Sequence, residues 1–134
     1  MNKGFTLIEL LVVISIIGLL ASLAIVSFTG TQKQARDTQR RSDLKQYQNS
    51  LEIFANKNNW AFPSYTDSSG ASLPATVCTI IGLTNCLPDP RNDDDASFDY
   101  KYQADGSDSG TVDASKYVLW AKLEDDPKYF VICS

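Results

Sequence analysis

A continuous apolar run near the start of this chain limits its fold more than any other feature of the sequence. The run extends from Phe5 to Phe28, and its single charged side chain is that of Glu9. A helix needs about 20 apolar residues to cross the hydrocarbon layer of a membrane, and this run is long enough. Lys3 and the amino terminus precede it, which predicts a cytoplasmic start and export of the remainder.

Three interpretations of the run compete, and the first two are a cleaved secretory signal and a plain membrane anchor. A secretory signal has a shorter apolar region of about 7–15 residues, although Ser22-Leu23-Ala24 offers a cleavage site. Glu9 argues against both, because a carboxylate inside an apolar run costs roughly 2.5–3.5 kcal/mol on insertion scales. A buried acid instead predicts a cationic partner.

The third interpretation comes from the six residues Gly4-Phe5-Thr6-Leu7-Ile8-Glu9. They resemble the processing motif of type IV prepilins and of the pseudopilins of type II secretion. The resemblance implies that prepilin peptidase, a membrane-embedded aspartic peptidase, cuts between Gly4 and Phe5 and then methylates the new amino terminus of Phe5. The family often has a proline in the second half of this helix, at the position where Val26 stands here.

The position of Glu9 has a physical explanation under this interpretation. Cleavage would create a new α-amine at Phe5 that is positive near neutral pH. Pairing that amine with Glu9 of a neighbouring copy would neutralise two charges inside an apolar bundle. A buried pair adds little net stability, but a slipped register would leave both charges unpaired. Glu9 also lies in the first turn of its helix, where the dipole favours an anion. We expect Phe5 and Glu9 to form the subunit assembly site.

The remaining sequence predicts an α+β fold of the type IV pilin kind. Apolar residues spaced by three and four form one stripe of an amphipathic helix that continues the apolar run. They are Leu44, Tyr47, Leu51, Phe54 and Ala55. The expected organisation is a leader peptide at 1–4, a transmembrane and assembly helix at 5–30, its amphipathic continuation at 31–58 and a globular head at 59–134.

Within the head, alternating or apolar segments predict antiparallel strands that pack on the stripe. The strands are expected at 98–102, 117–123 and 129–133, with a loop region at 62–97 and a polar turn at 104–114. We therefore predict a small antiparallel sheet of three to four strands, covered on one face by the long helix.

Charge is unevenly distributed along the chain. Residues 31–57 contain six basic and three acidic side chains, a balance of +3, whereas residues 58–134 contain five basic and twelve acidic ones, a balance of −7. These charges are either solvated faces or a source of attraction between the helix of one copy and the head of another. The overall charge of −4 argues against a nucleic-acid partner. The sequence has no histidine, which removes the usual catalytic triads, and no enzyme activity is expected.

Three cysteines, Cys78, Cys86 and Cys133, predict one disulfide in an oxidising compartment. Cys78 and Cys86 would close a short loop, but either could instead bond to Cys133. The sequence leaves this choice open.

A loop in the head has a loose likeness to a calcium site. Asp105, Asp108 and Asp113 place carboxylates in a glycine-containing segment, which makes them candidate calcium ligands. Lys116 stands where a bidentate glutamate belongs, so an ordinary polar turn is the alternative. Major pseudopilins bind calcium in their C-terminal loops, and no other cofactor is expected.

The resemblance implies a structural subunit of a type IV pilus-like filament that serves adhesion, motility or DNA uptake. The alternatives are a major-type pseudopilin that drives protein export by type II secretion and a monomeric membrane-anchored binding module. The implied partners are further copies of the chain, prepilin peptidase, an inner-membrane assembly platform and, before assembly, membrane lipid. The implied location is the inner membrane as a single-pass precursor, then an extracellular or periplasmic filament.

Overall fold

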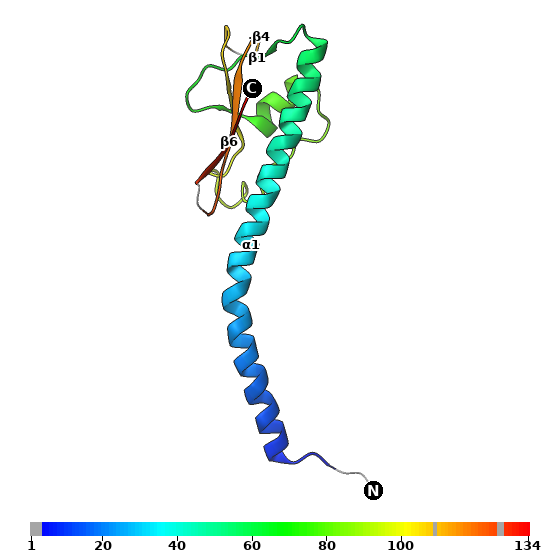
Figure 1. The fold of residues 1–134 in the computed structure, drawn as a ribbon, viewed down its shortest axis with the longest axis vertical. Coiled ribbons are helices and arrows are strands. Elements are labelled where there is room, and N and C mark those ends of the chain that lie inside the picture. The colour runs from blue at the N-terminus through cyan, green and yellow to red at the C-terminus, as the bar shows by residue number, and fades with distance from the viewer. Residues whose placement is uncertain (1–3, 109, 126–127) are drawn as a thin grey trace. The chain divides into compact units, whose positions relative to one another are not determined.

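The chain divides into two compact units in the computed structural model, which describes residues 4–108, 110–125 and 128–134. The first unit covers residues 1–35 and the second covers residues 36–134. Helix α1, Leu7–Lys57, contributes residues to both units (Figure 1). The side chain of Val26 lies outside the described part of the chain.

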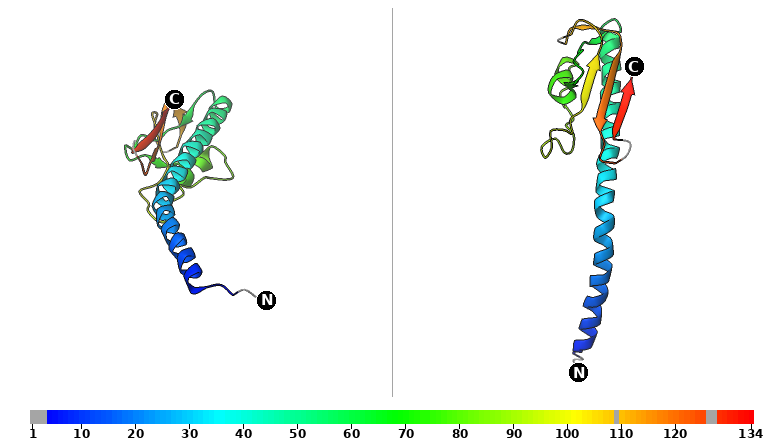
Figure 2. Two further views of the ribbon diagram at one scale, coloured as in Figure 1. Left: turned by 60° about the horizontal axis from the view of Figure 1, so that its bottom comes forward. Right: turned by 90° about the vertical axis from the view of Figure 1, so that its left-hand side faces the viewer.

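The second unit is an antiparallel sheet that packs on residues 36–57 of α1, as the views in Figures 1 and 2 show. Its four strands lie in the order β2-β3-β5-β6. They are β2 (Ala71–Ser72), β3 (Lys101–Ala104), β5 (Tyr117–Lys122) and β6 (Tyr129–Cys133). Two short strands, β1 (Phe62–Pro63) and β4 (Val112–Ala114), form a separate antiparallel pair. A π-helical turn, η1 (Leu73–Val77), and the short helix α2 (Cys78–Ile80) follow β2.

The core lies between the helix stripe and the inner face of the sheet. Leu44, Tyr47, Leu51 and Ala55 of the predicted stripe are buried, whereas Phe54 is half-buried at its border. Strand β5 alternates strictly, so its inner side chains are buried and its outer ones are half-buried. The predicted α+β fold with an antiparallel sheet of three to four strands is confirmed, and this sheet has four.

Several predicted boundaries in the head were wrong. The strand expected at 98–102 begins only at Lys101, although the Tyr100 carbonyl accepts a hydrogen bond from the Leu73 N–H group at 2.8 Å. The segment 62–97, expected to be loop, contains β1, β2, η1 and α2. The polar turn expected at 104–114 contains β4. A strand of two or three residues is too short to show an alternating pattern in the sequence. Such a strand forms because a distant segment pairs with it, and its local propensity does not predict it.

A buried guanidinium joins three segments of the second unit. Arg40 is fully buried on α1, and it donates to Asp89 through Nε at 2.6 Å and Nη2 at 3.0 Å. Its Nη1 donates to Asp37 at 2.6 Å and to Glu124 at 3.0 Å. Glu124 follows β5, and Asp89 lies in the loop that leads towards β3. The network therefore fixes the helix, the loop and the end of a strand to one another.

Two further arginines complete the charges around Glu124. Arg36 donates to both of its carboxylate oxygens, each at 2.6 Å, and Arg91 lies 3.6 Å from Oε2. The main-chain N–H groups of Glu124 and Asp125 donate to Asp37. Every carboxylate that contacts Arg40 thus accepts hydrogen bonds from more than one donor. These hydrogen bonds offset the free-energy cost of removing the charges from water.

We predict that the stability of the second unit falls steeply in acid because of Glu124. Hydrogen bonds from Arg36 lower the pKa of Glu124 to about 2. This value lies below the unfolded one of about 4.3. The stabilisation is therefore complete above that unfolded value and is lost as the pH falls towards 2. Glu124→Gln should lose about 3 kcal/mol at pH 7, as expected when one partner of a buried ion pair is removed. Its unfolding free energy should depend less on pH between 5 and 2.

Urea unfolding at a series of pH values, followed by tryptophan fluorescence, measures the unfolding free energy of the second unit. Trp60 and Trp120 both lie in this unit and report on it. Asp43 acts in the opposite direction because burial raises its pKa, but it is present in both proteins and its effect cancels in the comparison. Asp125→Asn is the matched control, since this neighbouring acid is exposed. Equal acid sensitivity in Glu124→Gln and wild type would contradict the prediction.

Candidate assembly site in the N-terminal helix

The first unit exposes an apolar helix. A stretch of α1 is long and apolar enough to cross a membrane, and none of it is buried against the rest of the described chain. Leu7 and Ile8 are 82% and 70% exposed, and apolar side chains continue in every direction around the helix as far as Phe28. A helix that is apolar on all sides is stable only when lipid or other helices surround it.

The helix begins with three hydrogen bonds that Thr6 and Glu9 make to each other. Glu9 Oε2 accepts from the Thr6 N–H group at 2.8 Å and from the Thr6 hydroxyl at 2.7 Å. The Glu9 N–H group donates to Thr6 Oγ1 at 3.3 Å. This is a capping box, in which two otherwise unpaired N–H groups of the first turn are satisfied by side chains.

The capping box places the carboxylate at the very start of the apolar helix. Both donors contact Oε2, and no residue in the described part of the chain donates to Oε1. Both donors to Glu9 belong to Thr6 and are neutral. Among the described residues, no basic side chain forms an ion pair with the negative charge of Glu9. Gly4 and Phe5 precede the helix, and the Phe5 side chain is 91% exposed. The residues from Met1 to Lys3 lie outside the described part of the chain.

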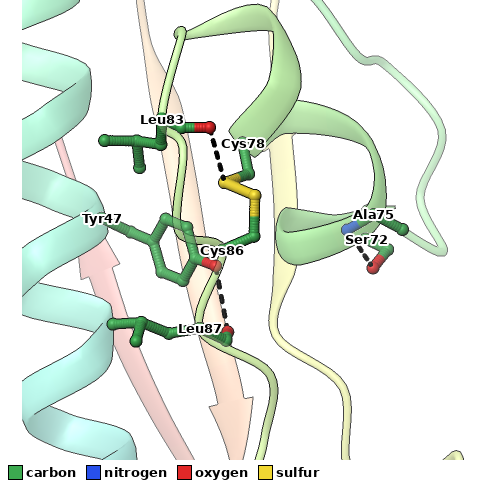
Figure 3. Close-up of a disulfide and its surroundings, with 7 residues drawn as sticks. All are labelled: Tyr47, Ser72, Ala75, Cys78, Leu83, Cys86 and Leu87. Atoms are coloured by element: carbon green, nitrogen blue, oxygen red, sulfur yellow. Dashed lines mark hydrogen bonds between the residues drawn. A yellow bond between two sulfur atoms is a disulfide. The ribbon is translucent and has the colours of Figure 1, made fainter.

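The structure decides between the disulfide pairings that the sequence left open. Cys78 and Cys86 form the bond, and Cys133 is a free, exposed thiol on β6. Figure 3 shows the disulfide between Cys78, at the start of the short helix α2, and Cys86, in the loop that follows this helix. Beside it, the Tyr47 hydroxyl of α1 donates to the Leu87 carbonyl at 3.0 Å (Figure 3). The closed loop is therefore attached to the helix as well as to itself.

The three candidate calcium ligands accept hydrogen bonds from main-chain N–H groups, two of them within their own segment and one from Thr66. Asp105 accepts from the N–H groups of Ser115 and Lys116, at 2.7 and 2.9 Å. Asp113 accepts from the Ser107 N–H group, and Asp108 accepts from that of Thr66. Among the described residues, no group of three or more acidic, histidine or cysteine side chains is arranged to hold a metal ion. What is observed here is a polar turn whose carboxylates accept main-chain hydrogen bonds from the turn itself and from Thr66.

Residues 1–25 match the family model described as the prokaryotic N-terminal methylation motif. The type II secretion system core protein G of Vibrio cholerae is 30% identical over 123 residues, which cover 84% of this chain and 77% of the relative. The chain belongs to the family of type IV pilins and type II secretion pseudopilins. Its fold and its N-terminal motif are those of a pilin-like protein, and this is a structural family rather than an enzyme family.

Pilin relatives are found as well. The type IV wide pilus major component PilA4 of Thermus thermophilus is 41% identical over 82 residues, covering 56% of this chain and 60% of the relative. The type IV major pilin protein PilA of Myxococcus xanthus is 38% identical over 61 residues, covering 45% and 28%. The pilin-like chain thus spans less than two thirds of the length of either pilin. No solved structure matches it.

The structure adds Thr6 to the site residues that the sequence suggested. Its spacing to Glu9 is the capping-box pattern of threonine followed three residues later by glutamate, and this signal was present in the sequence. The buried charge network around Arg40 had no comparable signal, because only Asp37 is near Arg40 in the sequence and its other two partners, Asp89 and Glu124, lie 49 and 84 positions away.

We predict that the disulfide stabilises the second unit. Closing a loop of this length lowers the entropy of the unfolded chain by an amount worth about 2–3 kcal/mol, since Cys78 and Cys86 are eight positions apart. The double variant Cys78→Ala/Cys86→Ala should lose at least that much in urea unfolding. Cys133→Ala is the control and should unfold like the wild type, because its thiol is free and exposed. Equal stability of all three proteins would show that the bond contributes nothing.

Proposed function

We propose that this chain is the structural subunit of a type IV pilus-like filament, assembled through its apolar N-terminal helix. The observation that supports this most is a carboxylate in the first turn of an exposed helix that is apolar on all sides. Such a helix needs surrounding apolar surface, and such a carboxylate needs a cation. Another copy of the same helix, with a free amine at its start, supplies both.

The assembly step follows from processing. Cleavage between Gly4 and Phe5 produces a positive amine next to the capping box, and methylation keeps that charge. The amine of one copy then approaches Glu9 of its neighbour, where Oε1 is available. Apolar contact between helices provides the attraction. The charge pair selects the register of the helices, because only one register brings the amine of Phe5 next to the Glu9 carboxylate.

The same chemistry fits a second candidate, the major-type pseudopilin of a type II secretion system. The chain covers 77% of the length of one relative that is a core protein G. Long filaments on the cell surface would support the pilus, and short filaments together with loss of protein export in a deletion strain would support the pseudopilin. In both cases the proposed partners are further copies, prepilin peptidase and an inner-membrane assembly platform.

The proposed route begins at the inner membrane, where the apolar helix spans the bilayer once and the head lies outside the cytoplasm. Extraction into a filament then exchanges lipid contacts for helix contacts. The domain organisation of leader, assembly helix, amphipathic continuation and head, with boundaries at 1–4, 5–30, 31–58 and 59–134, remains part of this proposal.

We predict that the mature chain begins with an N-methylated Phe5. Mass spectrometry of the amino-terminal peptide of the protein extracted from membranes measures this directly. A chain that begins at Ile25 would identify an ordinary secreted protein, and one that begins at Met1 would identify a plain anchor. Either result would contradict the proposed function.

We predict that Glu9→Ala leaves membrane insertion and processing intact but lowers the yield of sheared filaments at least tenfold. The variant leaves the amine of Phe5 without a partner in an apolar environment, which costs several kcal/mol. Electron microscopy and quantitation of sheared filaments provide the measurement.

Thr6→Ala is the matched control for that experiment. It removes the capping hydroxyl, at a cost of about 1 kcal/mol of helix stability, but retains the Glu9 carboxylate. It should therefore assemble far better than Glu9→Ala. If the two variants were equally impaired, Glu9 would act through the cap of its own helix and not through a neighbouring amine.

A further inference from the structure

Strand β6 has one side that no other strand covers among the described residues, because it is the last strand in the order β2-β3-β5-β6 (Figure 2). Its hydrogen bonds to β5 show which main-chain groups are directed to that side. The Leu123 N–H group donates to the Lys128 carbonyl at 2.7 Å, and the Ser134 N–H group donates to the Tyr117 carbonyl at 3.1 Å.

Hydrogen-bonded and non-hydrogen-bonded pairs alternate along an antiparallel ladder. In the observed register of β5 and β6, this alternation gives Phe130 and Ile132 the bonds to β5. The main-chain N–H and C=O groups of Tyr129, Val131 and Cys133 are therefore directed away from β5. They form a row of three donors and three acceptors along the open edge.

This edge lacks the features that usually prevent strand pairing. Residues 129–134 contain no charged side chain, no proline and no glycine, and the pairing of β6 with β5 shows no bulge. Edge strands are commonly protected by lysine, by proline or by a covering segment. Tyr129 and Val131 are 53% and 51% exposed, and Cys133 is exposed, so no described segment covers the outer face of the strand beside this edge.

We propose that β6 pairs with β6 of a second copy of this chain, antiparallel and about a two-fold axis at Val131. The outward groups of one copy then meet those of the other, so Val131 lies opposite Val131 of the second copy. Tyr129 lies opposite Cys133 of the second copy, and the reverse pairing holds by symmetry. This register uses all three donors and all three acceptors of each edge.

Charge favours a second copy at this edge and disfavours it elsewhere on the head. Residues 58–134 have a balance of −7, so two heads repel each other at most surfaces. In the proposed register, no acidic residue is opposite another, and Lys128 lies opposite Ser134. The neutral edge is therefore a place where two acidic heads can approach without bringing like charges together.

The outer face of the sheet would also become continuous across the pair. Val131 is the strand partner of Trp120, and the ring of Trp120 lies against Gly70. Gly70 has a φ of +74°, and a Cβ atom there would lie 2.5 Å from that ring, so glycine is required. Pairing two copies joins their two Trp120–Val131 rows into one apolar row and covers the side of each Val131 that faces the edge.

A two-fold contact of this kind is closed, since each β6 edge is occupied by the other and no β6 edge is left for a third copy. Such a contact joins copies in pairs, so it cannot by itself build a filament. The inference does not depend on the filament proposed above, because it uses only groups of the second unit.

Cysteine cross-linking of the full-length chain in detergent tests the register. In a Cys133→Ser background, Val131→Cys should form a disulfide dimer at least tenfold faster than Tyr129→Cys. Opposite residues in an antiparallel hydrogen-bonded pair have Cα atoms about 5.5 Å apart, within the range of a disulfide. The two Tyr129 positions would instead be about 14 Å apart along the strands, because four residues at about 3.4 Å separate them.

A third variant checks the other pair of the register. Tyr129→Cys with Cys133 retained should cross-link as fast as Val131→Cys, because these positions lie opposite each other. The wild type, with Cys133 as its free thiol, should cross-link as slowly as the Tyr129→Cys, Cys133→Ser control. Tryptophan fluorescence confirms that each variant is folded.

Three results would overturn the inference. Equal rates for Val131→Cys and its control would show that the apolar helices merely bring copies together without register at β6. Rapid dimerisation of the wild type through Cys133 would show a different register. Absence of any cross-link would show that this edge does not pair with a second copy.

Discussion

The second unit depends on compensating one charge, that of the buried Arg40. Its guanidinium contacts carboxylates from α1, from the loop that contains Asp89 and from the end of β5 at Glu124. It also lies over the ring of Phe98, 4.6 Å from the ring centre. Because an uncompensated charge in the interior costs several kcal/mol, none of these segments can move away without a large penalty. The hydrophobic stripe attracts the sheet to the helix, and the network determines where along the helix it is held.

Local patterns predicted the larger elements because each of them is periodic. The helix stripe and the alternation in β5 report which side faces the core, and the uncharged segment 129–133 became β6 with the expected bounds. The same reasoning missed β1, β2 and β4, whose two or three residues are strands only because a distant partner pairs with them. At the candidate site, Glu9 was evident as an acid in an apolar run, and Thr6 was accessible from its spacing. The pairing of Cys78 with Cys86 required the fold, since the sequence allowed either cysteine to reach Cys133.

The two proposed contacts between copies of this chain use different chemistry. Contact through the N-terminal helix uses apolar surface together with the carboxylate at its start. Contact through β6 uses main-chain hydrogen bonds along an edge without charged side chains. The side chains of this strand leave the edge open to a partner, and the main-chain groups provide the attraction. One variant at Glu9 and one at Val131 can therefore affect assembly in separate ways.

The charge network has one more consequence, which concerns ionic strength. Its three arginines, Arg36, Arg40 and Arg91, balance Asp37, Asp89 and Glu124, so the network is neutral overall. Residues 58–134 contain only Arg91, Asp89 and Glu124 of this network, so the network supplies 1 − 2 = −1 of their balance of −7. The other six units of net negative charge come from other side chains, many of them in contact with solvent, such as Asp93 and Asp94. Dissolved salt screens exposed charges over about 10 Å at 0.1 M but screens buried pairs much less. Adding salt should therefore weaken the repulsion between heads while leaving each head equally well folded.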